Sequence, residues 1–233
     1  MQEFTDPALA KLFVGIKGFQ QRFYQREPSQ MRDLVEHGQH PAVLLIACSD
    51  SRVDPALLTA AAPGELFVVR NVANLVPPYS LDGKYDGARS AIEYAVRDLK
   101  VRHIVVLGHA HCGGIKALLG AFAGQPVQRD FIGGWVSIAM DACCNYILKP
   151  LSEAGDGEGE EVRELDIDSL REHQHLVERA AIRGSIANLA TYPWLRERMD
   201  AGELSLHGWW FDLETGDLWT TDAGNTCFLP VLD

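Results

Sequence analysis

Two short, almost wholly apolar runs constrain the fold of this 233-residue chain more than any other feature. They occupy residues 42–47 (AVLLIA) and 104–107 (IVVL). An uninterrupted apolar run of this length is typical of a strand buried on both faces, as the strands of parallel sheets are. The sequence therefore predicts a parallel sheet that holds both runs in its interior.

The segments around these runs alternate between helical and strand patterns. We expect a short helix from Asp54-Pro55, a strand over 65–70, a helix over 86–99 and another helix from Gly113. Further along the chain we expect an apolar helical segment from Trp135, an acidic solvated loop over 151–168 and a long helix from Asp168 through Ala190. Such alternation with short connections predicts an α/β fold, a mostly parallel central sheet flanked by helices. Ligands of these sheets bind beyond the carboxyl ends of the strands.

Both ends of the chain add to this core. An amphipathic helix is predicted from Pro7 to about Gln25, and it either covers its own sheet or packs on a second subunit, which we favour. At the other end, a strand over 204–212 and a second over 217–220 predict an edge hairpin as the last regular structure. We expect one domain, with a helical arm over residues 1–34 and a zinc-binding core over 35–220.

Composition excludes several classes of partner. The net charge of −11 argues against nucleic acid, because phosphate binding needs a basic face. No apolar stretch has the length of a membrane span, and the first residues lack the pattern of a secretory signal. We therefore expect a cytoplasmic protein that binds neither nucleic acid nor membrane. In that reducing compartment the cysteines are ligands (Cys48, Cys112) or core residues (Cys143, Cys144).

Both apolar runs lead into side chains of the kinds that bind zinc. Cys48 follows the first run, His109 follows the second, and Cys112 comes three residues later before two glycines. Two thiolates and one imidazole from neighbouring strand ends leave a fourth position open, which is typical of catalytic zinc. His111 is a competing imidazole. Because adjacent residues seldom turn both side chains onto one ion, we expect His111 to lie outside the ligand set.

A carboxylate and a guanidinium, Asp50 and Arg52, follow the first thiolate. Asp50 could be a fourth zinc ligand or could accept a hydrogen bond from zinc-bound hydroxide, and Arg52 could hold it off the metal bidentately. Zinc lowers the pKa of bound water to about 7, so a hydroxide nucleophile is expected at neutral pH. A tight, mostly apolar pocket would suit a small uncharged electrophile. Phe67, Val72 and Tyr94 are candidates for its walls or for ordinary core.

Five segments carry a family resemblance in the right order: 47–53 (ACSDSRV), 63–74 (PGELFVVRNVAN), 108–114 (GHAHCGG), 185–189 (SIANL) and 205–209 (SLHGW). Together they resemble the β-class carbonic anhydrases. The resemblance implies reversible hydration of carbon dioxide to bicarbonate and a proton. It implies one zinc ion per chain on Cys48, His109 and Cys112. It also implies an Asp50–Arg52 dyad and a homodimer or higher homo-oligomer, with a tetramer favoured.

The same resemblance separates two branches of that family. One branch can close the site with the aspartate, and it binds a regulatory bicarbonate near a Trp, an Arg and a Tyr. Here Arg70 is present, but Leu45 and Phe211 stand at the other two positions. In the plant-type branch, substrate contacts would fall on Gln39, Phe67, Val72, Tyr94 and Gly113. We therefore expect an open site at neutral pH.

Two rival functions remain at this point. A hydrolase for carbon disulfide or carbonyl sulfide could use the same hydroxide on the same scaffold. A non-catalytic zinc-binding module is the second rival, although such a module needs neither Asp50 nor Arg52. His37, His40 and His103 are candidates for relaying protons or are plain surface histidines.

Overall fold

The computed structural model describes residues 6–82, 86–125, 129–143, 145–146, 167–225 and 227–231. The chain divides into two compact units, Met1–His40 and Pro41–Asp233. The smaller unit contains α1 (Pro7–Gln20), a π-helical turn (Gln21–Arg26) and α2 (Pro28–His37). The predicted N-terminal helix is thus present, and α2 follows it without having been predicted.

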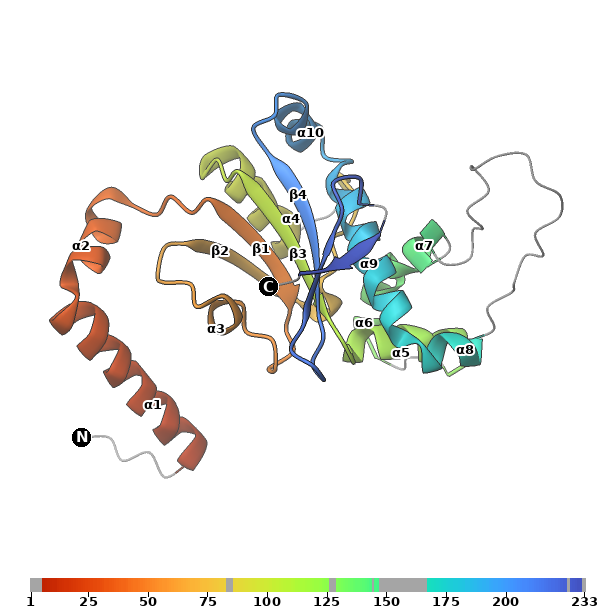
Figure 1. The fold of residues 1–233 in the computed structure, drawn as a ribbon, viewed down its shortest axis with the longest axis horizontal. Helices are drawn as coiled ribbons and strands as arrows, with labels where there is room; N and C mark the ends of the chain where they lie inside the picture. The colour runs from red at the N-terminus through yellow and green to blue at the C-terminus, as the bar shows by residue number, and fades with distance from the viewer. Residues whose placement is uncertain are drawn as a thin grey trace. The chain divides into compact units, whose positions relative to one another are not determined.

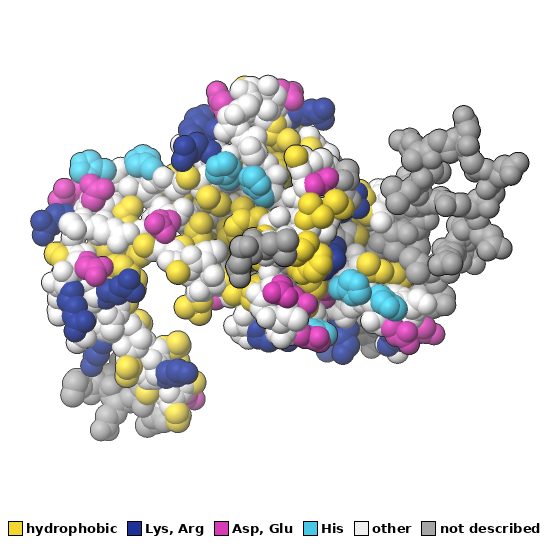
Figure 2. All heavy atoms as spheres, viewed as in Figure 1, with side chains coloured by type: hydrophobic (Ala, Val, Ile, Leu, Met, Phe, Trp, Pro, Cys, Tyr) yellow, Lys and Arg dark blue, Asp and Glu magenta, His cyan; other side chains and the backbone are white. Residues whose placement is uncertain are grey.

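The start of α1 follows from its first residues. The carboxylate of Asp6 accepts hydrogen bonds from the N–H groups of Ala8 and Leu9, and Pro7 occupies the first turn. The helix has no buried residue, and Figure 2 shows hydrophobic side chains on the surface of this unit. The large exposed ones on α1 are Leu9, Leu12, Phe13, Val14, Ile16 and Phe19. An apolar surface of this kind is typical of a helix that packs on another chain.

A six-stranded sheet forms the larger unit (Figure 1). Its order is β2 (Leu66–Asn71), β1 (Val43–Cys48), β3 (His103–His109), β4 (Ser205–Phe211), β5 (Leu218–Thr221) and β6 (Phe228–Pro230). The first four strands in this order are parallel, and β5 and β6 are antiparallel. The predicted mostly parallel α/β fold is confirmed, with both apolar runs in interior strands.

Helices connect and flank these strands. They are α3 (Pro55–Thr59), α4 (Gly87–Glu93), α5 (Gly113–Phe122), α6 (Ile132–Val136), α7 (Met140–Cys143), α8 (Ile167–Glu172), α9 (Gln174–Leu189) and α10 (Pro193–Asp200). Figure 1 shows α5, α6 and α8 gathered beside α9 at the end of the sheet where β3 leads into α5. Across the described part of the chain, no helix combines the length and apolar character that crossing a bilayer requires.

The core lies on both faces of the sheet because side chains alternate along each strand. On one face, Leu44 and Ile46 pack with α9 residues such as Ile182. On the other face, Leu45 and Ala47 form a second buried cluster with residues of β3. This burial on both faces explains why the two runs are continuously apolar rather than alternating.

Three sequence predictions are corrected by the structure. The strand β6 follows the hairpin, so 217–220 is not the last regular structure. The long helix predicted from Asp168 is broken at His173, which separates α8 from α9. The helical segment from Trp135 is divided among α6, a 3₁₀ turn (Ser137–Ala139) and α7. The elements β6, α6 and α7 are each too short for a clear hydrophobic period.

Cys143 is buried as predicted, whereas Cys144 lies outside the described residues. The acidic segment that we expected to be a solvated loop, 151–168, lies outside them up to residue 166.

One arginine of α9 connects this helix to the last three strands. The guanidinium carbon of Arg179 lies 4.2 Å from the ring centroid of Trp210 in β4 and 4.5 Å from that of Trp219 in β5. It also lies 5.7 Å from the ring centroid of Phe228 in β6. Cation–π contacts of this kind contribute about 0.5–2 kcal/mol each. The C-terminal strands are therefore attached to α9 by charge as well as by apolar contact.

The close approach of β4 to α9 requires glycine at position 208. A Cβ placed on Gly208 would lie 2.7 Å from Cγ2 of Thr221 and 2.9 Å from Cγ2 of Ile182. We expect Gly208→Ala to lower the free energy of unfolding by about 1–3 kcal/mol through overpacking. Urea denaturation measures this loss. Gly134→Ala is the control, because no atom lies within 4 Å of its added Cβ, and equal stability of the two variants would contradict the prediction.

Candidate metal centre

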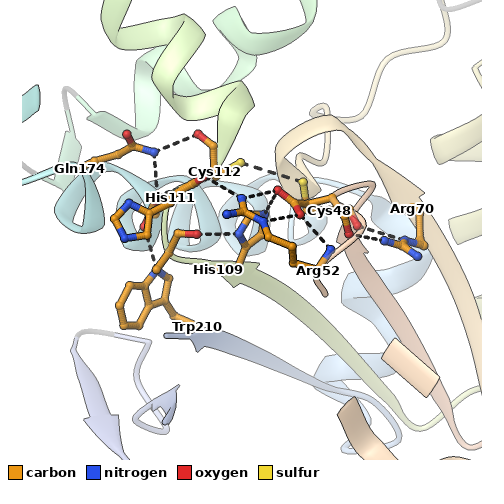
Figure 3. Close-up of polar contacts among 11 residues, drawn as sticks. Cys48, Arg52, Arg70, His109, His111, Cys112, Gln174 and Trp210 are labelled. Carbon is orange, nitrogen blue, oxygen red and sulfur yellow. Dashed lines mark hydrogen bonds and ion pairs between the residues drawn. The ribbon is translucent and has the colours of Figure 1, made fainter. Parts of the chain in front are cut away.

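The two apolar strands bring three metal-binding side chains to one end of the sheet. Cys48 ends β1, His109 ends the adjacent β3, and Cys112 lies in the turn before α5 (Figure 3). Their ligand atoms all lie within 4.8 Å of one another, with 4.0 Å between the two Sγ atoms. All three residues are buried. Within the described residues, no other group of His, Cys, Asp and Glu side chains meets this condition.

The imidazole of His109 is oriented for metal binding. Its Nδ1 donates a hydrogen bond of 2.8 Å to the backbone carbonyl of Ala110, which leaves the lone pair on Nε2. The Nε2 atom is buried and has no hydrogen-bond partner. A buried nitrogen without a partner is costly unless an ion satisfies it. Together with two sulfur atoms, this nitrogen fits the ligand preference of Zn²⁺.

The two cysteines are electrostatically coupled. The hydrogen bond with Cys112 is the main cause that lowers the pKa of Cys48 to about 4, against burial, which raises it. The hydrogen bond with Cys48 and burial raise the pKa of Cys112. The pair therefore favours one thiolate that is hydrogen-bonded to one thiol. A divalent cation would replace the shared proton and hold both sulfur atoms as thiolates.

Asp50 lies beside the ligand atoms but is held by Arg52. The Nε and Nη2 atoms of Arg52 donate hydrogen bonds of 2.9 Å and 2.7 Å to the two carboxylate oxygens, and its backbone N–H donates a third of 3.0 Å. These bonds lower the pKa of Asp50 well below its usual range, although burial opposes them. Oδ2 of Asp50 is 3.9 Å from Nε2 of His109. An ionised carboxylate thus faces the metal position and is restrained by a bidentate pair.

A second arginine stabilises the loop that carries Cys48 and Asp50. Arg70, near the end of β2, donates hydrogen bonds of 3.0 Å to the carbonyl of Cys48 and 2.7 Å to the carbonyl of Asp50. It also forms an ion pair of 2.9 Å with Asp54, the N-cap of α3. The family resemblance connects Arg70 only with bicarbonate binding. Its contacts in this chain are with the loop.

His111 takes part in the turn but not in the ligand set. Its backbone has a left-handed φ of 57°, and its side chain points to Glu214 with a distance of 2.7 Å between Nε2 and Oε1. Its carbonyl accepts a hydrogen bond of 3.2 Å from Arg52. Because His111 has this left-handed conformation, its side chain points away from that of Cys112. His111 therefore lies outside the ligand set, as expected.

Two of the residues expected to contact substrate, Gly113 and Val72, lie at the turn that carries Cys112. Gly113 begins α5 directly after Cys112, and Val72 lies against the same turn, because a Cβ on Gly114 would come within 2.8 Å of Val72. Val72 also lines a cleft of about 740 Å³ together with Asn71, Asp86, Phe131 and Trp135. The structure thus brings these two predicted residues next to the metal ligands.

Phe67 and Tyr94 are placed elsewhere in the unit. Their rings contact each other, with 5.8 Å between centroids. Phe67 lies four residues before Asn71, the partner of Cys48 in the sheet, which is roughly 13 Å along the strand. These two side chains do not join the metal ligands of their own chain. Gln39 belongs to the smaller unit, after α2.

His103 cannot relay protons from the metal centre of its own chain. It begins β3, whereas His109 ends this strand, so the two are roughly 20 Å apart. Its Nδ1 instead lies 3.3 Å from Nε2 of His207 in β4.

Comparison with known proteins agrees with this fold and donor set. The family model described as carbonic anhydrase matches residues 43–218. A carbonic anhydrase of Synechocystis sp. is 36% identical over 92% of this chain and 72% of its own length. The solved structure of the β-carbonic anhydrase CcaA has a TM-score of 0.77 at 32% identity, covering 98% of this chain and 94% of that one. A structure from the report on two tetrameric β-carbonic anhydrases of Sordaria macrospora has a TM-score of 0.72 at 26% identity, covering 96% and 100%.

The fold and the Cys-His-Cys donor set are those of a metalloenzyme with a mostly parallel sheet. This chain belongs to the β-class carbonic anhydrases.

Sulfur ligation is testable by replacement of Cys48. We expect Cys48→Ser to retain much less zinc than the wild type, because a harder, less readily ionised oxygen replaces a thiolate. Metal analysis after dialysis against a chelator measures the bound zinc per chain. Cys227→Ser is the control, since this cysteine is exposed and lies outside the donor set. One full equivalent of zinc on Cys48→Ser would contradict ligation by this residue.

Proposed function

We propose that this chain catalyses the reversible hydration of carbon dioxide to bicarbonate and a proton with one zinc ion per chain. Cys48, His109 and Cys112 would hold that ion. The observation that carries the proposal is the convergence of these three donors beside a carboxylate, Asp50, that is already bound to Arg52. Bound zinc would supply the Lewis acidity that makes a water molecule acidic near pH 7.

Asp50 would orient the attacking water. Because Arg52 keeps the pKa of Asp50 low, the carboxylate accepts a hydrogen bond but does not retain a proton near neutral pH. A hydrogen bond from the water to Oδ2 of Asp50 would leave a lone pair of the water oxygen directed toward carbon dioxide. The proton of the reaction must then leave through another group or through solvent. Asp50 is therefore an orienting acceptor rather than the final base.

The same pair supports an open site at neutral pH. Both carboxylate oxygens of Asp50 accept hydrogen bonds from Arg52, so coordination of a metal by Asp50 would compete with this bidentate pair. The bicarbonate-binding pattern is also incomplete, since Leu45 is buried in the sheet and Phe211 pairs with His109 at the strand end. A fourth protein ligand on zinc at pH 8 would contradict the open site.

Val72 and Gly113 are the substrate contacts that the fold of this chain supports best, because both adjoin the turn that carries Cys112. Phe67 lies too far along β2 to line the same pocket, and the ring of Tyr94 packs against Phe67. A role for them in substrate binding requires the metal centre of a neighbouring subunit. Gln39 stays a prediction from the family resemblance.

Two rival functions share parts of this site. Carbon disulfide and carbonyl sulfide would be attacked by the same nucleophile, and the apolar Val72 beside the turn that carries Cys112 suits such molecules. A non-catalytic zinc module would need no restrained carboxylate, whereas Asp50 receives three hydrogen bonds from Arg52. A cytoplasmic location remains a prediction.

Stopped-flow measurement of proton release from dissolved carbon dioxide tests the reaction and the role of Asp50. We expect Asp50→Ala to lower kcat roughly 10²-fold while zinc stays bound, since a preorganised hydrogen-bonding partner of the reacting group is lost. Asp217→Asn is a control at an exposed aspartate outside the site. Wild-type protein with no activity above buffer would leave the sulfur substrates or the zinc module. Full activity of Asp50→Ala would overturn the assigned role.

We also propose a homodimer or higher homo-oligomer, with a tetramer favoured. The support is the apolar surface of α1, where Leu12 and Ile16 are 62% and 61% exposed, and the similarity to a structure reported among tetrameric relatives. A Leu12→Lys/Ile16→Lys variant should form smaller particles in sedimentation-velocity experiments, because two buried charges would disrupt the contact. Lys11→Ala on the same helix is the control. Unchanged particle size would exclude this surface from the interface.

A further inference from the structure

A set of hydrogen bonds holds the backbone of Cys112 from behind the metal centre. Oε1 of Glu178 accepts a hydrogen bond of 2.9 Å from the N–H of Cys112. Nε2 of Gln174 donates to the carbonyl of Cys112 at 2.9 Å and to Oε1 of Glu178 at 2.8 Å. Figure 3 shows Gln174 directed toward Cys112. Both peptide groups of one ligand are thus bound by side chains of α9.

Glu178 is a buried carboxylate that depends on these bonds. Only 3% of the residue is exposed, and its second oxygen accepts a hydrogen bond of 3.1 Å from the indole N–H of Trp210. Three N–H donors therefore converge on the two oxygens, so that both oxygens accept hydrogen bonds. A buried carboxylate is costly even when it is hydrogen-bonded, so an apolar residue would serve packing alone better. This cost points to a specific task for Glu178.

That task follows from the geometry of the turn. Cys112 lies between the left-handed His111 and the first turn of α5, in which the carbonyl of Cys112 accepts a bond of 2.9 Å from the N–H of Lys116. Gln174 and Glu178 are four residues apart on α9 and so share one face of it. Their bonds do not involve a metal. They fix the peptide of Cys112, from which the thiol projects toward Cys48, whether or not an ion is present.

We propose that Glu178 is a positioning residue for the metal centre: by holding the N–H of Cys112 it keeps the Cys112 thiolate in place for the ion and slows release of that ion. The inference rests on the proposed zinc ligation by Cys48, His109 and Cys112. It assigns Glu178 no contact with metal or substrate. Gln174 supports the same peptide at its carbonyl.

Glu178→Gln tests the proposal with little change in volume. An amide offers one oxygen and one NH₂ group, so either Cys112 or Trp210 would meet a donor instead of an acceptor. We expect zinc to transfer from the holoenzyme to an excess of chromophoric chelator roughly 10–100-fold faster than from the wild type. In the Co²⁺-substituted protein, the thiolate-to-cobalt absorption should also change. Neither readout depends on catalytic activity.

Two matched variants separate positioning from general packing. Trp210→Phe removes the donor to the other oxygen of Glu178 but keeps an aromatic ring beside Arg179 and leaves the bond to Cys112, so zinc release should stay near the wild-type rate. Glu172→Gln is the same chemical change at an exposed glutamate of α8. Melting of each metal-free variant reports the loss of stability that packing alone would cause.

The proposal is overturned if Glu178→Gln releases zinc at the wild-type rate, or if Trp210→Phe accelerates release equally. If Glu178→Gln does not fold, Gln174→Ala replaces it, since it removes the bond to the Cys112 carbonyl from a half-buried position. Unchanged zinc release from that variant would likewise overturn the inference. Wild-type protein that binds no zinc would instead overturn the proposed function.

Discussion

The parallel pairing of β1 with β3 places every other part of the site. The two strands run side by side from Val43 and His103, so that their ends, Cys48 and His109, lie at one end of the sheet. Each strand is buried on both faces, which makes their register costly to change. A shift of one strand by one residue would turn its side chains to the opposite face and would move its ligand away from that of the other strand. The metal centre therefore depends on the stability of the central sheet rather than on loop structure alone.

Two arginines beside the metal centre bind different groups of the same loop. Arg52 binds the carboxylate of Asp50, whereas Arg70 binds the backbone carbonyls of the same loop. Because one guanidinium fixes the side chain and the other fixes the peptide, Asp50 is restrained in both position and ionisation. Two thiolates would neutralise a divalent ion. A carboxylate bound to an arginine in this way would be compatible with such a centre at neutral pH.

The sequence predicts the central strands, the three sulfur and nitrogen donors and the Asp50–Arg52 pair because each is a local pattern beside an apolar run. It does not predict the role of Glu178, which is 66 residues from Cys112 and lies in a helix whose other residues are mostly apolar or small. The only signal in the sequence is that a charged residue, Glu178, stands among the apolar residues on the buried face of this helix. The strand β6 has only three residues, too few to show the alternating pattern of a strand. Pairing with β5 and the contact of Phe228 with Arg179 stabilise it.

Through the stack of Arg179 with Trp210, Trp219 and Phe228, a substitution near the C-terminus could affect the metal centre. Arg179 follows Glu178 directly, so the aromatic rings of β4, β5 and β6 contact the stretch of α9 that binds the N–H of Cys112. Phe228, in the last strand, is thereby connected with the residues that hold Cys112 through the guanidinium of Arg179. Loss of the ring at position 228 would therefore remove one of the three aromatic contacts that hold Arg179, next to the residue that binds the N–H of Cys112.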